Sequence, residues 1–269
     1  MRSHHVLILL LALLWAPLVQ AAFDPRHPAW DALLKQQVVV ASGGVASTVR
    51  YAALQADPKA LRGYLASVSA VTPQEYASWS RTDRLAFLIN AYNAFTIDLV
   101  LTRYPDLKSI KDLASVFQSP WKRKAFTLIG EQRSLDDLEH GLIRAPGVFD
   151  DPRINVAVVC ASVGCPMLRE EAYVGERLGA QLDDAMRRFL SDRSRNRFEA
   201  ESGTLSVSKL FDWYHADFDR GHQGLWSLQT LFIRYADTLG TTPASRAEIR
   251  AGRFKIVHLD YDRSLNDAR

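Results

Sequence analysis

Two cysteines, Cys160 and Cys165, are the only thiols in this chain of 269 residues. Their thiolates would be its strongest candidate nucleophiles. The apolar run from Ile154 predicts a buried strand over 154–160 that ends in a turn of small residues. Pro166 favours the first position of a helix, because the N–H that proline lacks would be unpaired there. Cys165 is therefore predicted at a helix N-terminus, which favours the reactive thiolate.

A cysteine nucleophile needs a base to remove its proton, and His140 and Glu139 are the candidates. Both lie in a helix predicted over 135–144. Thiol hydrolases on several folds combine a cysteine with a histidine and a carboxylate or amide. We therefore expect Cys165 to attack the carbonyl of a peptide-like amide or a thioester, as a hydrolase or an acyl-transferase. Neighbouring helical residues point about a quarter-turn apart, so one of Glu139 and His140 should be structural.

Two asparagines, Asn90 and Asn93, lie three residues apart in an apolar helix predicted over 81–103. They share one face of that helix. A buried amide without a hydrogen-bond partner costs about 1 to 3 kcal/mol, so both side chains need partners. One hypothesis is that they line a pocket beside Cys165. The other is that they hold a neighbouring loop by bonding to its backbone.

A disulfide between Cys160 and Cys165 is the main alternative to catalysis. The four residues between them are small enough for a tight loop, and a bridge needs Cα atoms roughly 4.4 to 6.8 Å apart. With the bridge formed, the protein would be a non-catalytic binding or scaffolding domain. The spacing is not that of a Cys-x-x-Cys site, which makes a dedicated oxidoreductase the weaker hypothesis.

Residues 1–21 have the pattern of a cleaved signal peptide. A basic residue precedes the aliphatic run from Val6 to Leu14, and small residues stand at alternate positions around Ala21. The run is shorter than the ~20 residues that a membrane span needs. We therefore predict a periplasmic or secreted protein without a stable membrane span, whose residues 22–269 form a single domain.

Composition and spacing argue against several classes of partner. The formal charge is +3 and no basic stripe is present, so nucleic acid is not expected as a partner. His215, Asp217 and Asp219 lack the ligand spacing of a zinc site, and we expect the polar residues of that segment to face water. The glycine pair Gly43 and Gly44 is not followed by the lysine of a phosphate-binding loop, so nucleotide binding is not predicted. We predict neither a metal nor a cofactor, and a peptide-like ligand is the one partner that the sequence suggests.

Helical spacing dominates the rest of the chain, which predicts an α+β fold with helices around a small sheet. Helices are predicted over 73–76, 81–103, 135–144, 179–190 and 225–239, and another begins at Pro166. Strands are predicted over 126–130 and the residues that follow, 154–160, 204–208 and 254–262. We expect the last strand to pair with 154–160 and to pack Val257, Leu259 and Tyr261 against the core.

Several separated motifs make the chain resemble domain-of-unknown-function family 547 over about residues 50–266. These motifs lie at 85–94, 134–140, 152–155 with 160–166, 205–214 with 217–218, and 260–266. The resemblance implies that Asn90, Asn93, Arg153 and either Glu139 or His140 form one polar cluster near Cys165. Many members of that family have histidine at the position of Asn155, which we include among the candidate binding residues.

Overall fold

The computed structural model describes residues 22–113 and 119–268. The expected signal peptide, residues 1–21, lies outside them. The fold is α+β and dominated by helices, as predicted. The α-helices are α1 Pro28–Gln37, α2 Tyr51–Ala56, α3 Lys59–Ser69, α4 Pro73–Ser78, α5 Arg81–Leu101, α6 Leu178–Ser191, α7 Leu210–Trp213, α8 Leu228–Arg234, α9 Ala236–Leu239 and α10 Pro243–Arg250. The strands are β1 Val38–Val40, β2 Ser47–Val49, β3 Phe126–Leu128, β4 Glu131–Arg133, β5 Arg197–Glu199, β6 Thr204–Ser208 and β7 Lys255–Leu259.

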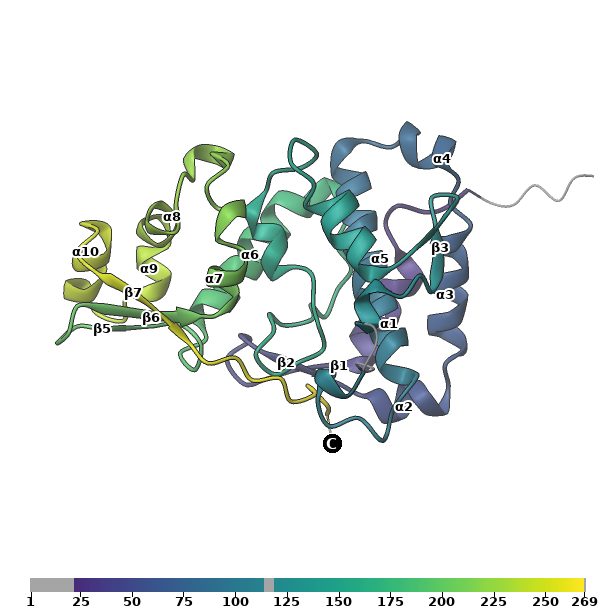
Figure 1. Ribbon diagram of the computed structural model, residues 1–269, viewed down its shortest axis with the longest axis horizontal. Helices are drawn as coiled ribbons and strands as arrows, with labels where there is room; N and C mark the ends of the chain where they lie inside the picture. The colour runs from purple at the N-terminus through teal and green to yellow at the C-terminus, as the bar shows by residue number, and fades with distance from the viewer. Residues whose placement is uncertain (1–21, 114–118, 269) are drawn as a thin grey trace, which may run out of the picture.

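Helix α5 is the centre of the larger hydrophobic core. Ser80 caps its N-terminus by accepting the N–H of Asp83 at 3.1 Å. Every residue from Leu85 to Ile97 is buried, so the helix is enclosed on all sides. Helices α1 to α4 and the hairpin β3–β4 lie around it (Figure 1). By length and apolarity α5 meets the criteria for a membrane span, but 78% of its apolar window is buried inside the protein.

A second hydrophobic core lies at the other end of the molecule (Figure 1). It joins α6, whose apolar face includes Met186 and Phe189, to α7 through α10 and a three-stranded sheet in the order β5-β6-β7. The sheet pairs β5 and β6 antiparallel and β6 and β7 parallel. Val156 belongs to this second core, whereas Ile154 and Ala157 belong to the first. The segment before the cysteines therefore joins the two cores.

The prediction of a strand over 154–160 is wrong. Pro152–Val156 forms a 3-10 helix, η4. The side chain of Asp151 caps its N-terminus by accepting the N–H of Arg153 at 3.0 Å. The next backbone groups bond to a side chain instead of a neighbouring strand. Asn93 donates to the carbonyl of Ala157 at 2.9 Å and accepts the N–H of Val159 at 3.0 Å. An apolar run signals burial, and here a helical asparagine supplies the backbone partners that a strand would have supplied.

The helix predicted from Pro166 is also absent, because residues 166–174 are irregular. Asn90 holds this segment through both backbone groups of Tyr173, at 2.7 and 3.0 Å. Regular structure resumes near α6.

The closing strand exists as β7, but its predicted pairing and packing are wrong. It pairs with β6, because residues 154–160 are not extended and offer no ladder of backbone groups. Val257 is 47% exposed, whereas Ile256 on the opposite face packs against the second core. Alternation along a strand identifies two faces, but only the neighbouring layer decides which of them is buried.

Candidate active site around the paired cysteines

The two cysteines meet across a tight turn. The backbone N–H of Cys160 points at the Sγ of Cys165 at 2.8 Å, and the N–H of Cys165 donates to the carbonyl of Ser162 at 3.1 Å. Ala161 lies in the left-handed region with φ 63°, a conformation that costs a non-glycine residue free energy. The prediction that Cys165 begins a helix is therefore wrong, since the turn is followed by irregular chain. Its Sγ accepts a hydrogen bond from a turn amide instead.

The C-terminal segment holds this turn in place. Val163 donates its N–H to the carbonyl of Ser264, and Gly164 donates to that of Asp262, both at 2.8 Å. A Cβ atom on Gly164 would lie 2.8 Å from the Asp262 carbonyl oxygen, a contact that only glycine avoids. The chain's end thus returns to the cysteine motif, as expected, but through these residues after β7 instead of through the strand itself.

Hydroxyl groups surround the Sγ of Cys160. The hydroxyl oxygens of Tyr261 and Ser162 each lie 3.1 Å from it. Because Ser162 donates its one hydroxyl proton to the Tyr261 oxygen at 3.1 Å, the Tyr261 hydroxyl is left to donate to the sulfur. Burial raises the pKa of Tyr261, so this side chain stays protonated and can donate to sulfur. Such donors stabilise a thiolate more than a thiol.

The pKa values of the two thiols are shifted in opposite directions. A hydrogen bond from the Cys165 thiol outweighs burial and, with the hydroxyls of Ser162 and Tyr261, lowers the pKa of Cys160 to about 6. Burial raises the pKa of Cys165 well above its usual value, and the adjacent Cys160 raises it further. Cys160 is also the more exposed of the two. The geometry therefore makes Cys160 the thiolate and Cys165 the thiol that donates to it, and both are free in the structure.

A cavity of about 340 Å³ opens beside the thiols. It lies where the two cores meet, because its walls come from α5, the π-helix over 137–143, η4 and the segment after it, α7, and the chain after β7, with Ile110 and Trp121 from the segments between α5 and β3. Four predicted site residues line it: Cys165, Glu139, His140 and Asn155. The cavity is also lined by Cys160, Tyr92, Tyr214, Trp213, Tyr261 and Arg263.

Glu139 is the structural member of the neighbouring pair Glu139 and His140. It is 6% exposed in the π-helix η3, Asp137–Ile143. Tyr92 donates to its Oε2 at 2.8 Å and Tyr214 to its Oε1 at 3.0 Å. The Arg144 guanidinium lies 3.4 Å from Oε1. Both carboxylate oxygens of Glu139 are therefore held by partners from other segments of the chain.

His140 is half-exposed, and its Nδ1 accepts a hydrogen bond from Arg144 at 2.7 Å. Arginine only donates, so Nδ1 must be the acceptor and the proton of the neutral ring must sit on Nε2. A ring in this state has no free lone pair for the proton of a thiol. His140 would have to release Arg144 before it could serve as a general base.

Asn155 lies at the cavity wall beside the buried Asp217. Its Nδ2 donates to Asp217 Oδ2 at 2.9 Å and to the carbonyl of Pro152 at 3.2 Å. Its buried Oδ1 has no hydrogen-bond partner within the described residues. Arg144 and Arg220 also pair with Asp217, at 2.6 and 2.9 Å.

The prediction that Asp217 faces water is therefore wrong. Asp217 is the centre of a buried ionic network. It is 5% exposed.

The remaining predicted residues lie outside the cavity. Asn90 and Asn93 bond to the backbone of Tyr173 and of residues 157 and 159, which is the loop-holding alternative. Arg153 pairs with Asp151 at 2.7 Å and reaches the carbonyl of Gly179 at 3.3 Å. The expected single cluster is thus divided: one part lines the cavity, and the other fixes the segments that carry the thiols.

The site residues predicted from the sequence did not include Cys160, whose thiol has the lowered pKa, or Tyr92, Tyr214, Tyr261 and Arg144. The three tyrosines come from segments far apart in the chain, so no spacing could reveal them, whereas Arg144 follows His140 by four residues, a helical spacing that could have indicated the contact. Within residues 22–113 and 119–268, no group of three or more His, Cys, Asp or Glu side chains could hold a metal ion.

Comparison with known proteins supports the family resemblance. A family model described as "Protein of unknown function, DUF547" matches residues 76–190, which include both cysteines, Glu139, His140 and Asn155. No curated protein and no solved structure matches the chain.

Proposed function

We propose that this chain, a DUF547 protein over residues 76–190, is a thiol-dependent hydrolase or acyl-transferase whose nucleophile is Cys160. The observation that carries the proposal is the set of donors around one sulfur. The Cys165 thiol and the Tyr261 hydroxyl both favour a thiolate on Cys160. A thiolate is the nucleophilic form of cysteine, and this one borders a cavity large enough for a substrate.

In the proposed reaction the Cys160 thiolate attacks a substrate carbonyl carbon. A C–S bond forms, and the carbonyl electron pair moves to oxygen. Its return expels the leaving group and leaves an acyl-thioester on Cys160. Water, or a second acceptor in an acyl-transferase, then releases the acyl group and regenerates the thiol.

The two predicted bases at the cavity are both engaged by other side chains, which favours a thioester over a peptide amide as substrate. An amine leaving group must gain a proton as the C–N bond breaks, whereas a thiol leaves as its thiolate. His140 is bonded to Arg144 through Nδ1, and Glu139 already accepts from two tyrosines. Neither is poised to shuttle a proton.

Turnover of a small-molecule acyl-thioester, followed by loss of the thioester absorbance, tests the proposal. We expect Cys160→Ser to lower the rate by roughly 10²-fold or more, because it removes the nucleophile. Cys165→Ser should have a smaller effect, since serine keeps a hydroxyl donor. Mass spectrometry should find the trapped acyl group on Cys160. Equal turnover by folded wild-type and Cys160→Ser protein would overturn the proposal.

The non-catalytic alternative predicts a different result in the same protein. If Cys160 and Cys165 form a disulfide, thiol titration of the folded chain without reductant should find no free thiol. Turnover should then be absent as well. That pair of results would favour the binding or scaffolding domain.

A further inference from the structure

Arg263, which has no ionic partner among the described residues, lies over two aromatic rings at the cysteine cavity. The Arg263 guanidinium carbon lies 5.3 Å from the ring centre of Trp213 and 5.5 Å from that of Tyr261. The two rings are 4.8 Å apart, centre to centre. The hydroxyl of the same Tyr261 touches Cys160 Sγ. One tyrosine ring therefore connects the cationic group to the thiolate.

The charge of Arg263 is unbalanced by its surroundings. Its side chain makes no ion pair or hydrogen bond with any residue in 22–113 or 119–268. The other arginine near this cavity, Arg144, pairs with both Asp217 and Glu139. Glu139, which lines the cavity with Arg263, already bonds to two tyrosines and pairs with Arg144. Asp136, also in the lining, lies 3.9 Å from the His140 ring.

The position of Arg263 is fixed from its backbone. Its carbonyl accepts the hydroxyl of Ser109 at 2.8 Å and the N–H of Ile110 at 3.3 Å. Aromatic rings attract a guanidinium over their faces and leave its N–H edges free for a planar anion. A carboxylate accepts two of those N–H groups at once.

From this geometry we infer that the cavity selects acyl substrates that carry a carboxylate, with Arg263 as the residue that binds it and Trp213 and Tyr261 contacting a planar part of the molecule. The inference rests on the proposed function for the reaction that follows, but anion binding itself does not require turnover. Asn155 Oδ1, which lacks a donor, would accept an amide N–H of the same ligand.

Binding of a matched pair of small molecules tests the inference without any reaction. N-benzoylglycine offers a ring, an amide and a carboxylate, whereas N-benzoylglycinamide is its neutral isostere. We expect calorimetry or tryptophan fluorescence to show roughly tenfold tighter binding of the acid. Arg263→Gln should abolish this preference and leave the affinity for the amide unchanged. Equal affinity of wild-type protein for both probes, or a preference that survives in Arg263→Gln, would overturn the inference.

Alkylation of the thiol gives a second readout that locates the anion site. Iodoacetate and iodoacetamide differ mainly in charge, and both label free cysteine. The ratio of their rates at Cys160 should fall roughly fivefold in Arg263→Gln. Arg253→Gln, at an exposed arginine that pairs with Glu248, is the matched control that keeps the ratio. An unchanged ratio in Arg263→Gln would contradict the assignment to this cavity. If thioester turnover is absent but the charge preference is retained, the proposed enzyme activity is refuted and the anion site is still supported.

Discussion

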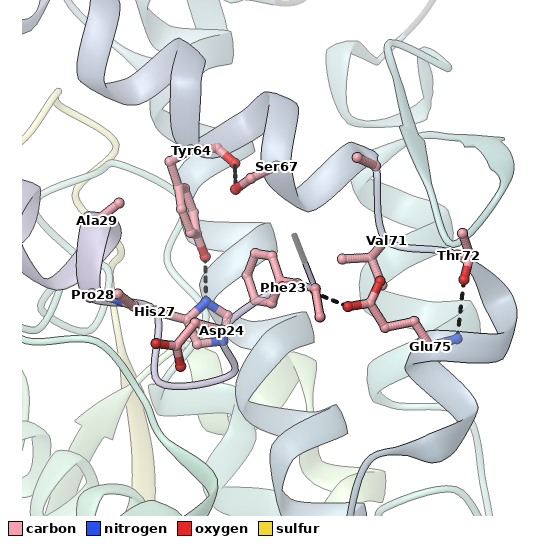
Figure 2. Close-up of a pocket in the computed structure, with 12 residues that line it drawn as sticks. Phe23, Asp24, His27, Pro28, Ala29, Tyr64, Ser67, Val71, Thr72 and Glu75 are labelled. Carbon is pink, nitrogen blue, oxygen red and sulfur yellow. Dashed lines mark hydrogen bonds between the residues drawn. The ribbon is translucent and has the colours of Figure 1, made fainter. Parts of the chain in front are cut away.

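Two cavities of nearly the same size differ in what their walls contain. One has a volume of about 360 Å³ and lies between the segment 22–29 and helices α3 and α4. In Figure 2, His27 meets Tyr64 through a hydrogen bond of 2.7 Å, and Glu75 accepts the N–H of Phe23 at 2.7 Å. The other, of about 340 Å³, borders the cysteines.

The polar groups of the two cavities respond to burial in different ways. Burial lowers the pKa of His27 to about 3, so this ring is neutral and holds the N-terminal segment against α3. At the cysteine cavity, two adjacent thiols have pKa values shifted in opposite directions. At the same cavity lie the Arg263 guanidinium and the Asn155 Oδ1, neither of which has an ion pair or hydrogen bond within the part of the chain that the structure describes. Opposed shifts among neighbouring groups, more than cavity volume, mark a site suited to chemistry.

Removal of residues 260–269 should have the largest of the expected effects on stability and thiol reactivity. It removes part of the wall of the cysteine cavity and no lining residue of the other cavity. The loss takes away Tyr261, the buried Leu265 and the backbone bonds that hold the turn at 162–164. Several kcal/mol should be lost, which lowers the melting temperature by about 10 °C or more. Cys160 and Cys165 should then react alike with iodoacetamide. A truncated protein with an unchanged melting temperature and a selective Cys160 would show that this segment is peripheral.

His27 should give a smaller, pH-dependent effect confined to the other cavity. Its folded pKa of about 3 lies below the unfolded value of about 6.5. The unfolded chain therefore binds the proton first, and stability should fall by several kcal/mol as the pH drops from about 6.5 to 3. In His27→Asn, which tolerates the left-handed backbone at φ 54°, part of this slope should disappear. Urea unfolding at a series of pH values measures it, and identical slopes in both proteins would refute the assignment.

The sequence predicted the helix-dominated fold and most long elements, because periodic apolar spacing is a local signal. It identified α5 and α6 and the strands β3 and β6 with small errors at their ends. It failed at 154–160, where Asn93 replaces a partner strand. That substitution depends on a contact between residues far apart in the chain, which periodicity does not encode.

The candidate site likewise has some residues that the sequence could predict and others that depend on tertiary contacts. The sequence predicted Asn90, Asn93, Arg153 and Glu139 or His140 in one cluster near Cys165, and of these only Glu139, His140 and Cys165 line the cavity. Asn155, a candidate binding residue, lines it as well. The choice between the two thiols depends on Tyr261, which is 101 residues from Cys160. Only the folded chain brings that hydroxyl to the sulfur. Residue types therefore suggested thiol chemistry, whereas tertiary contacts decide which cysteine carries it.

The pH dependence of alkylation at each cysteine tests the central claim most directly. Folded protein is pulsed with iodoacetamide from pH 4 to 10, and peptide mass spectrometry separates Cys160 from Cys165. The contacts of Cys160 predict that it reacts first, with a rate that rises through a midpoint near pH 6, while Cys165 stays protected beyond the usual thiol pKa of about 8.5. Faster labelling of Cys165, or a shared midpoint near 8.5, would contradict the assignment of Cys160 as the nucleophile.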